Sequence, residues 1–522
     1  MNRRPSGIFL VLAIATQASF AALPQPVKIK SGLVAGVAAG DPSITVFRGI
    51  PFAAPPVGDL RWRAPRPAPV WTGVRKADRF SASCIQNVVT ERKPWTFEFM
   101  THGDISEDCL YLNIWTPAGA AREKHPVFFW MYGGGNTEGS AAVPVYDGEQ
   151  LAKKGLVVVT LNYRLGVLGF FTHPELTKES DTSGNYGLLD QLAALQWVMK
   201  DNIAAFGGDP ARVTIAGQSA GAADAHSLVA SPLAKGLFAR AIEESGSNIT
   251  GNVRTLAEQE KDGVRFAEAK GAHSLAELRA MSPQDLSTPV TGGAPLRFGP
   301  VVDGHFLTAP PNEIFAQGKQ NDVPELTGCN KDDLGGGVPH PNTSVDAFAK
   351  MAHQRYDNLA EAFLKLYPGE SNEQAGDAQN DSARDQLRTS MYLWALNREK
   401  TAKSKVWTYY WDHTLPGPDA DRYGAFHTSE VLYVFDSLAK SDRPFTDADR
   451  KIADMMSSYW ANFASTGNPN GKGLPHWPSV SDARGTTMEL GDTNKPIPIA
   501  GNSAKEAFLT EFLSKPRAVP RP

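Results

Sequence analysis

Three uninterrupted apolar runs constrain the fold of this chain more than any other feature. They are Val127–Met131 (VFFWM), Leu156–Leu161 (LVVVTL) and Val213–Ile215 (VTI). None of them shows the polar and apolar alternation of a strand that has one face in water. Such runs are typical of strands that are buried on both faces of a mostly parallel sheet. The sequence therefore predicts an α/β fold with a central, mostly parallel sheet that is flanked by helices.

Two helical patterns accompany these runs. In the segment 187–205, apolar residues fall on one face, and Gly207–Pro210 then stops the helix. Near the C-terminus a second face repeats every three to four residues until Gly467, through Ile452, Met456, Tyr459 and Phe463. The more polar segments 250–300 and 340–400 are predicted to be helical insertions over the sheet rather than separate domains.

Charge excludes one large class of partners. Lys and Arg number 52 against 56 Asp and Glu, which gives a net charge of −4 without any block of like charge. A nucleic-acid binder usually shows a basic excess or stripe, so we expect no nucleic-acid partner. The 11 histidines include no HExxH motif and no Cys/His spacing that suits zinc, so no metal is expected.

The N-terminus resembles a secretory signal peptide. Arg3 and Arg4 precede the apolar run Ile8–Ala15, and Ser19 and Ala21 are small residues at the positions that a signal peptidase reads. A membrane anchor or a buried strand is the alternative. We expect residues 1–21 to be removed, and the mature chain to be exported to the periplasm or the medium without a membrane span. An oxidising compartment would permit disulfides.

Catalytic chemistry is indicated by the pentapeptide Gly217-Gln218-Ser219-Ala220-Gly221, which matches G-x-S-x-G. A predicted strand precedes it and a helix rich in small residues follows, which is the context of a nucleophile elbow. The alternative is a glycine-rich loop with a solvated serine. A nucleophilic serine needs a base and a preorganised anion site. The backbone of Gly133-Gly134-Gly135, at the end of a buried strand, can supply that site, unless it is only a flexible loop.

Several longer motifs resemble those of the type-B carboxylesterase/cholinesterase family of α/β-hydrolases. They run nearly from end to end in family order: 47–53 (FRGIPFA), 55–58 (PPVG), 106–113 (SEDCLYLN), 162–164 (NYR), 187–191 (GLLDQ), 206–210 (FGGDP) and 216–221 (AGQSAG). The resemblance implies an α/β-hydrolase fold with helical insertions forming a gorge. It also implies one catalytic domain over residues 22–522.

The family resemblance also supplies the partners of Ser219. Its acid lies five residues after a glycine in a G-x-N-x-x-acid stretch, which places it at Asp333, where the family usually has Glu. Its base lies in a G-A-x-H stretch and corresponds to His427. The order Ser, Asp, His is that of α/β-hydrolases. The resemblance further implies oxyanion donors at Gly134, Gly135 and Ala220.

The resemblance also implies structural pairings. Cys84 and Cys109 would form a disulfide, which leaves Cys329 as a free and buried thiol. Arg48 with Glu107, and Arg164 with Asp190, resemble two buried ion pairs of the family, and we expect both to be structural.

Two departures from the family bear on the substrate. Gln218 stands where cholinesterases carry Glu, which weakens attraction for a quaternary ammonium group. Asn136 stands where an aromatic residue is common, so it is expected to make the pocket wall more polar. These features predict a serine carboxylic-ester hydrolase that acts on neutral or aryl esters through an acyl-enzyme, without a cofactor. The alternatives are an acyltransferase that uses the same acyl-enzyme, and a catalytically silent binding protein of the same fold.

Overall fold

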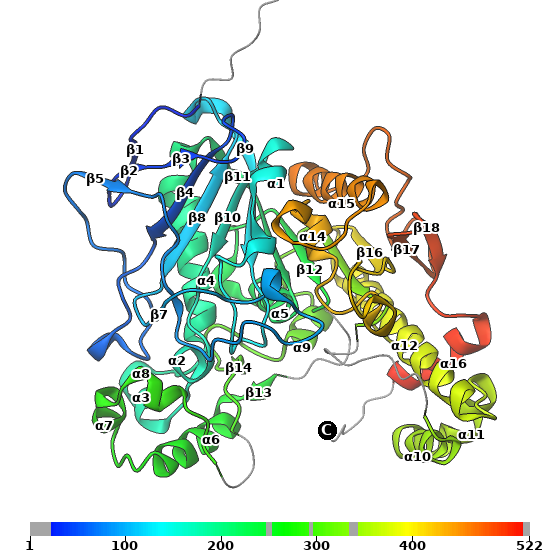
Figure 1. Ribbon diagram of the computed structural model, residues 1–522. Coiled ribbons are helices and arrows are strands. Elements are labelled where there is room, and N and C mark those ends of the chain that lie inside the picture. The colour runs from blue at the N-terminus through cyan, green and yellow to red at the C-terminus, as the bar shows by residue number, and fades with distance from the viewer. Residues whose placement is uncertain (1–21, 247–252, 292–295, 334–342, 515–522) are drawn as a thin grey trace, which may run out of the picture.

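An eleven-stranded mixed sheet forms the centre of the protein (Figure 1). The computed structural model describes residues 22–246, 253–291, 296–333 and 343–514, so the predicted signal peptide at 1–21 lies outside the described residues. The order of the strands across the sheet is β18-β17-β16-β15-β12-β11-β9-β10-β8-β4-β3. The seven strands from β17 to β10 run parallel to one another, and each strand beyond them pairs antiparallel with its neighbour.

The strands have the following bounds: β3 Val37–Ala38, β4 Thr45–Pro51, β8 Tyr111–Thr116, β9 His125–Met131, β10 Val157–Leu161, β11 Gly208–Gln218, β12 Arg240–Glu244, β15 Glu325–Asn330, β16 Val406–Trp411, β17 Thr486–Leu490 and β18 Lys495–Pro498. The three apolar runs of the sequence lie in β9, β10 and β11. These are adjacent parallel strands, as predicted.

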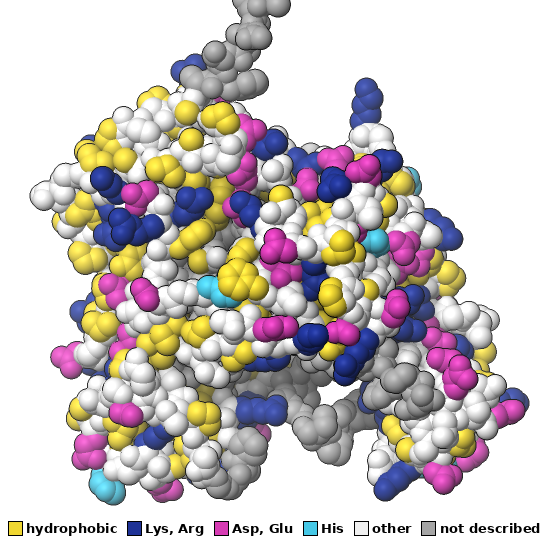
Figure 2. Space-filling view, viewed as in Figure 1, with side chains coloured by type: hydrophobic (Ala, Val, Ile, Leu, Met, Phe, Trp, Pro, Cys, Tyr) yellow, Lys and Arg dark blue, Asp and Glu magenta, His cyan; other side chains and the backbone are white. Residues whose placement is uncertain are grey.

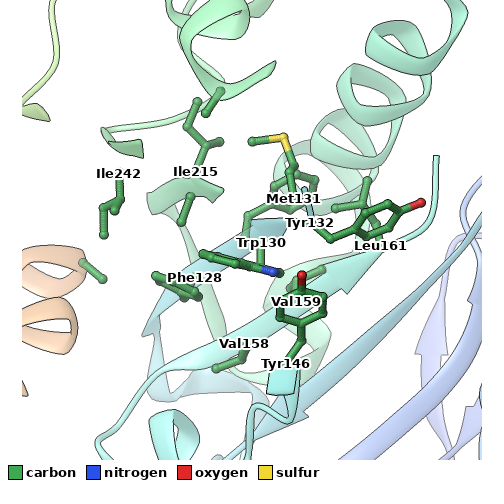
Figure 3. Close-up of a cluster of buried hydrophobic side chains, with 14 of the residues drawn as sticks. Phe128, Trp130, Met131, Tyr132, Tyr146, Val158, Val159, Leu161, Ile215 and Ile242 are labelled. Atoms are coloured by element: carbon green, nitrogen blue, oxygen red, sulfur yellow. The ribbon is translucent and has the colours of Figure 1, made fainter. Parts of the chain in front are cut away.

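The middle of the sheet carries the largest part of the hydrophobic core (Figure 3). Phe128 and Trp130 of β9 are fully buried and stack on each other, with ring centroids 6.0 Å apart. Ile215 of β11 and Ile242 of β12 extend the same core. Burial of whole apolar side chains stabilises this part of the sheet by roughly 1.5–3 kcal/mol for each side chain.

Helices cover both faces of the sheet. On one face α5 (Ala220–Ala230) packs on β11 and β12, α4 (Tyr186–Gln196) packs on α5, and α12 (Asn372–Thr401) packs on β15 and β16. On the other face α1 (Glu149–Lys153) and α15 (Asp447–Thr466) pack on the sheet, with α14 (Val431–Val434) against α15. The predicted C-terminal helix is α15, and it ends where Gly467 adopts a left-handed φ of 80°.

The predicted helix over 187–205 is only partly confirmed. After α4 the chain widens into a π-type turn at Trp197–Asn202 and tightens into a 3₁₀ turn at Ile203–Phe206. The Asn202 side chain donates from Nδ2 to the carbonyl of Trp197 (3.0 Å) and accepts the backbone N–H of Lys30 (2.9 Å). This side chain competes for the helical hydrogen bonds, which periodicity alone does not reveal.

The two predicted insertions form helical clusters at separate corners of the molecule (Figure 1). One contains α6 (Leu256–Ala269), α7 (Leu275–Ala280) and α8 (Pro283–Ser287), with a small hydrophobic core of its own. The other contains α10 (Val345–Tyr356) and α11 (Ala360–Leu366), with α16 (Ser503–Ser514) packed against α12. Within the described ranges, no helix is both long enough and apolar enough to cross a membrane.

The cysteine pairing is as the family resemblance implied. Cys84 and Cys109 form a disulfide, and Cys329 is a free thiol that is buried against Met391 and Tyr410.

One of the two expected ion pairs is correct and the other is wrong. Arg164 binds Asp190 with two bonds, from Nη2 to Oδ1 (2.7 Å) and from Nε to Oδ2 (2.8 Å). Glu107 pairs with Arg61 rather than with Arg48.

The pairing of Glu107 with Arg61 has a geometric reason. The Arg61 guanidinium donates to both carboxylate oxygens of Glu107 and also to the carbonyl of Met281, which ties the N-terminal region to the end of α7. The Arg48 guanidinium instead lies 5.2 Å from the centre of the Phe80 ring. Glu107 therefore pairs with Arg61, whose guanidinium also donates to the backbone carbonyls of Arg279 and Met281.

Candidate active site

Ser219 lies at the junction of β11 and α5, at the point where the sequence predicted a nucleophile elbow. Its backbone has φ 57° and ψ −122°, a conformation that is strained for a residue with a side chain. Its N–H donates to the carbonyl of Glu244 on the neighbouring strand β12 (2.8 Å). Strain of this kind persists only where surrounding structure enforces it, and it lifts the side chain out of the strand–helix packing.

The glycines of the pentapeptide allow the turn to close. A Cβ on Gly221 would lie 2.1 Å from the carbonyl oxygen of Met131, and one on Gly217 would lie 2.4 Å from Gly221. Both distances are far below any van der Waals contact. The motif therefore has glycine at these two positions because β9, β11 and α5 meet there without room for a side chain.

His427 and Asp333, which are almost one hundred residues apart, are brought together. His427 Nδ1 is hydrogen-bonded to Asp333 Oδ1, and both side chains are almost entirely buried. Asp333 Oδ2 accepts the backbone N–H of Asn330 at the end of β15, which orients the carboxylate. Burial lowers the pKa of His427, but the Asp333 charge and hydrogen bond outweigh it, so that the pKa is raised above its ordinary value.

Asp332, the adjacent acidic residue, faces a different set of groups. Its Oδ1 accepts from Arg384 Nη2 (2.6 Å) and its Oδ2 from the backbone N–H of Ala425 (2.9 Å). The two neighbouring carboxylates therefore do different work. Asp333 contacts the imidazole, and Asp332 anchors the loop that carries it.

The other ring nitrogen of His427 faces the pentapeptide. Gln218 Nε2 lies 3.3 Å from His427 Nε2, and Thr428 Oγ1 lies 3.4 Å from Gln218 Oε1. Among the described residues Ser219 Oγ makes no hydrogen bond to the ring. Contacts of this kind are often loose before a substrate is bound.

The glycine-rich loop lies directly against Ser219. A Cβ on Gly133 would approach Ser219 Cβ to 3.0 Å, and one on Gly134 would lie 2.2 Å from the carbonyl oxygen of Glu138. Gly134 and Gly135 have φ of 105° and 63°. The backbone N–H groups of Gly134, Gly135 and Ala220 have no acceptor among the described residues. Donors without an internal acceptor are available to bind a negatively charged oxygen.

A cleft of about 440 Å³ opens above Ser219 and His427. One wall comes from the loop 86–101, which follows the disulfide residue Cys84, and another from the loop 133–139. We expected the helical insertions to form the walls of the gorge. The described lining residues instead come mainly from these two loops, with others at 143–146, 218–219 and 427–428. Trp95, which no sequence pattern singled out, donates from its indole N–H to the carbonyl of His427 (3.0 Å) and so joins this wall to the histidine.

Asn136 does not face the cleft, which corrects its expected place in the pocket wall. Its side chain is buried and donates from Nδ2 to Asp224 Oδ1 on α5 (3.0 Å), and Gln191 Nε2 donates to the other oxygen (2.6 Å). Burial raises the pKa of Asp224 to about 7, although both amides oppose that shift. Asn136 therefore connects the glycine-rich loop to the helix behind Ser219.

Two buried glutamates behind the site were not predicted to be functional. Glu244 accepts from the indole N–H of Trp460 (2.7 Å), and Glu430 accepts from Asn330 Nδ2 (2.5 Å). Burial raises the pKa of both carboxyl groups, and the Glu430 charge raises that of Glu244 further. Glu430 lies three residues after His427, whose motif the family resemblance identified, whereas nothing in the sequence marks Glu244. No cluster of metal-ligating side chains occurs in the described part of the chain.

Comparisons with known proteins show which family the chain resembles. The family model described as "Carboxylesterase family" matches residues 24–509. The fumonisin B1 esterase of Sphingopyxis macrogoltabida is 38% identical over 486 residues, which cover 88% of this chain and 85% of that protein. The cocaine esterase of Oryctolagus cuniculus is 37% identical over 479 residues, 86% of this chain and 88% of that protein. The liver carboxylesterase 1F of Rattus norvegicus is 34% identical over 526 residues, 92% of this chain and 91% of that protein.

Proposed function

Because the chain belongs to the carboxylesterase family and is a carboxylic ester hydrolase, we propose that it cleaves neutral or aryl esters through Ser219, His427 and Asp333. The observation that carries this proposal is the meeting of three separate segments. A strained serine at the end of β11 lies in one cleft with a histidine whose Nδ1 is held by a buried carboxylate. That arrangement suits nucleophilic attack assisted by a general base.

The first half of the reaction forms the acyl-enzyme. Ser219 Oγ attacks the ester carbonyl carbon while His427 Nε2 accepts the hydroxyl proton. To do so, the serine hydroxyl takes the place beside Nε2 that the Gln218 amide occupies in the free protein. Asp333 keeps the proton on Nδ1, so that Nε2 is the accepting atom, and stabilises the imidazolium that forms.

The negative oxygen of the tetrahedral intermediate is stabilised by the N–H groups of Gly134, Gly135 and Ala220. Their freedom from other acceptors supports this role, because no internal hydrogen bond has to break when the charge develops. The intermediate then collapses, the C–O bond to the alcohol breaks, and His427 donates its proton to the leaving oxygen. A water molecule repeats both steps on the acyl-enzyme and releases the acid.

Export is proposed from the N-terminal sequence. A chain with one disulfide is compatible with an oxidising compartment. N-terminal sequencing of protein secreted by its own host should find Ala22 or Leu23 first, and an intact Met1 would contradict the proposal. We also propose that residues 22–522 act as one catalytic domain.

Labelling and mutation of Ser219 test the mechanism. A fluorophosphonate probe should label the native protein once, and Ser219→Ala should abolish both labelling and the hydrolysis of p-nitrophenyl acetate. Ser227→Ala is a matched control, because its hydroxyl only bonds to the carbonyl of Ala223 within α5. Full activity in Ser219→Ala would refute the proposal. Product analysis with added alcohol distinguishes hydrolysis from acyl transfer.

A further inference from the structure

The charged groups of the cleft cancel each other. Among the described residues that line it, the acidic and basic side chains other than His427 are Arg92 and Glu138. Arg92 Nη1 lies 2.6 Å from Glu138 Oε1, and Arg92 Nη2 lies 2.9 Å from Glu138 Oε2. This is a two-bond pair, in which each ion uses its strongest hydrogen-bonding geometry on the other. On the face shown in Figure 2, basic and acidic side chains are likewise interspersed rather than separated.

The pair joins the two walls of the cleft. Arg92 belongs to the loop 86–101, and Glu138 follows the glycine-rich loop, where its N–H donates to the carbonyl of Gly134 (3.1 Å). The same two loops are joined by Gln86, whose side chain accepts the N–H of Gly139 (2.8 Å) and donates to its carbonyl (2.8 Å). Arg92 and Glu138 are therefore held face to face by the backbones that carry them.

The rest of the cleft offers no charge to a substrate. Gln218 presents a neutral amide beside His427, and the walls include the side chains of Trp95, Phe99, Val143 and Tyr146. A charged ester that enters loses part of its hydration, which costs free energy unless an opposite charge replaces the water. Arg92 and Glu138 cannot replace it, because each is already neutralised by the other.

We propose that the Arg92–Glu138 pair sets the charge selectivity of the cleft, so that uncharged esters with apolar or aryl groups are preferred over anionic and cationic esters of the same shape. The inference rests on the proposed function, since it assumes that esters bind in the cleft of Ser219. It assigns to the two residues a role in specificity and none in bond cleavage.

Matched pairs of esters test this selectivity. For the acyl side, p-nitrophenyl hydrogen glutarate is compared with its glutaramate analogue, and p-nitrophenyl 4-(trimethylammonio)butyrate with 5,5-dimethylhexanoate. For the alcohol side, a phenyl acetate with a meta carboxylate is compared with its meta carboxamide. The readout is the ratio of kcat/KM between the charged and the neutral ester of each pair, because a general loss of folding or of catalysis cancels in a ratio.

Removal of one ion should expose the other. Glu138→Gln should raise the anion-to-neutral ratio about two- to fivefold, mainly through KM, and Arg92→Gln should raise the cation-to-neutral ratio by a similar factor. Both shifts should shrink in 0.5 M salt because the groups are partly exposed. The reversed pair, Arg92→Glu with Glu138→Arg, should restore the native ratios.

Unchanged ratios in both single variants, on the acyl and the alcohol side alike, would overturn the inference. Equal losses on every ester would do the same, since they would show that the pair only supports the loops. Neither result would contradict the proposed function, which is tested separately by Ser219→Ala.

Discussion

Replacement of Asp333 by asparagine tests how the two adjacent acids divide their work. The change keeps the size of a side chain that is only 5% exposed and is hydrogen-bonded to His427 Nδ1. Asparagine can donate an N–H to Nδ1, which stabilises the tautomer with its proton on Nε2. In that tautomer Nε2 cannot accept the proton of Ser219.

The structure sets the size of the effect. Asp333 is the carboxylate that bonds directly to the ring, so no other described acid can restore the tautomer. Loss of the correct tautomer in serine hydrolases costs about 10⁴ in kcat. Asp333→Asn should therefore lower kcat by about 10³–10⁴, which corresponds to roughly 4–5.5 kcal/mol in the activation barrier. Steady-state hydrolysis of p-nitrophenyl acetate at pH 8 measures it, with circular dichroism to confirm folding.

Asp332→Asn is the matched control. It keeps the bond from the N–H of Ala425 but weakens the pair with Arg384, which should cost about 1–3 kcal/mol of stability and less than tenfold in kcat. Asp333→Glu should remain active, since a carboxylate still faces the ring. If Asp332→Asn were the crippling change and Asp333→Asn the mild one, the assignment of the acid would be wrong.

Three further outcomes are expected. The kcat/KM should rise with pH to a plateau, with a midpoint above the ordinary histidine value of about 6.5 because Asp333 raises the pKa of His427; a profile that is flat from pH 5 to 8 would contradict this. Thiol titration of the denatured, unreduced protein should find one free cysteine, and reduction of Cys84–Cys109 should lower the free energy of unfolding by about 3 kcal/mol. Burial raises the pKa of Asp224 to about 7, so its neutral form stabilises the folded state at acid pH, and that contribution is lost as the pH rises towards 7. Chemical denaturation from pH 4.5 to 7.5 should therefore show that the free energy of unfolding falls less steeply with pH in Asp224→Asn than in the native protein.

Local sequence patterns were sufficient to predict several elements of the fold and the turn that carries Ser219. The apolar runs predicted β9, β10 and β11, because a short continuous apolar stretch is typical of a strand that is buried on both faces. The pentapeptide predicted the elbow, since glycine at 217 and 221 is required where strand and helix touch. The family resemblance, not periodicity, singled out His427 from 11 histidines and Asp333 from the two adjacent acids. The structure brings those two side chains together.

The contacts between distant groups depend on the path of the folded chain and could not be predicted from local patterns. Glu107 binds Arg61 rather than Arg48 because the path of the chain, not the spacing of residues, brings that guanidinium to it. The Asn136 side chain donates to Asp224 because a buried carboxylate without a hydrogen-bond donor costs free energy, whereas a polar group in the cleft wall can be solvated by water. The loop 86–101, which follows the disulfide residue Cys84, lies against the glycine-rich turn. The cleft between them is therefore lined by Trp95, Arg92 and Glu138. Local periodicity indicates which face of a helix or strand is buried. It does not indicate which distant residue each side chain contacts, since many side chains of the right type could make the same contact.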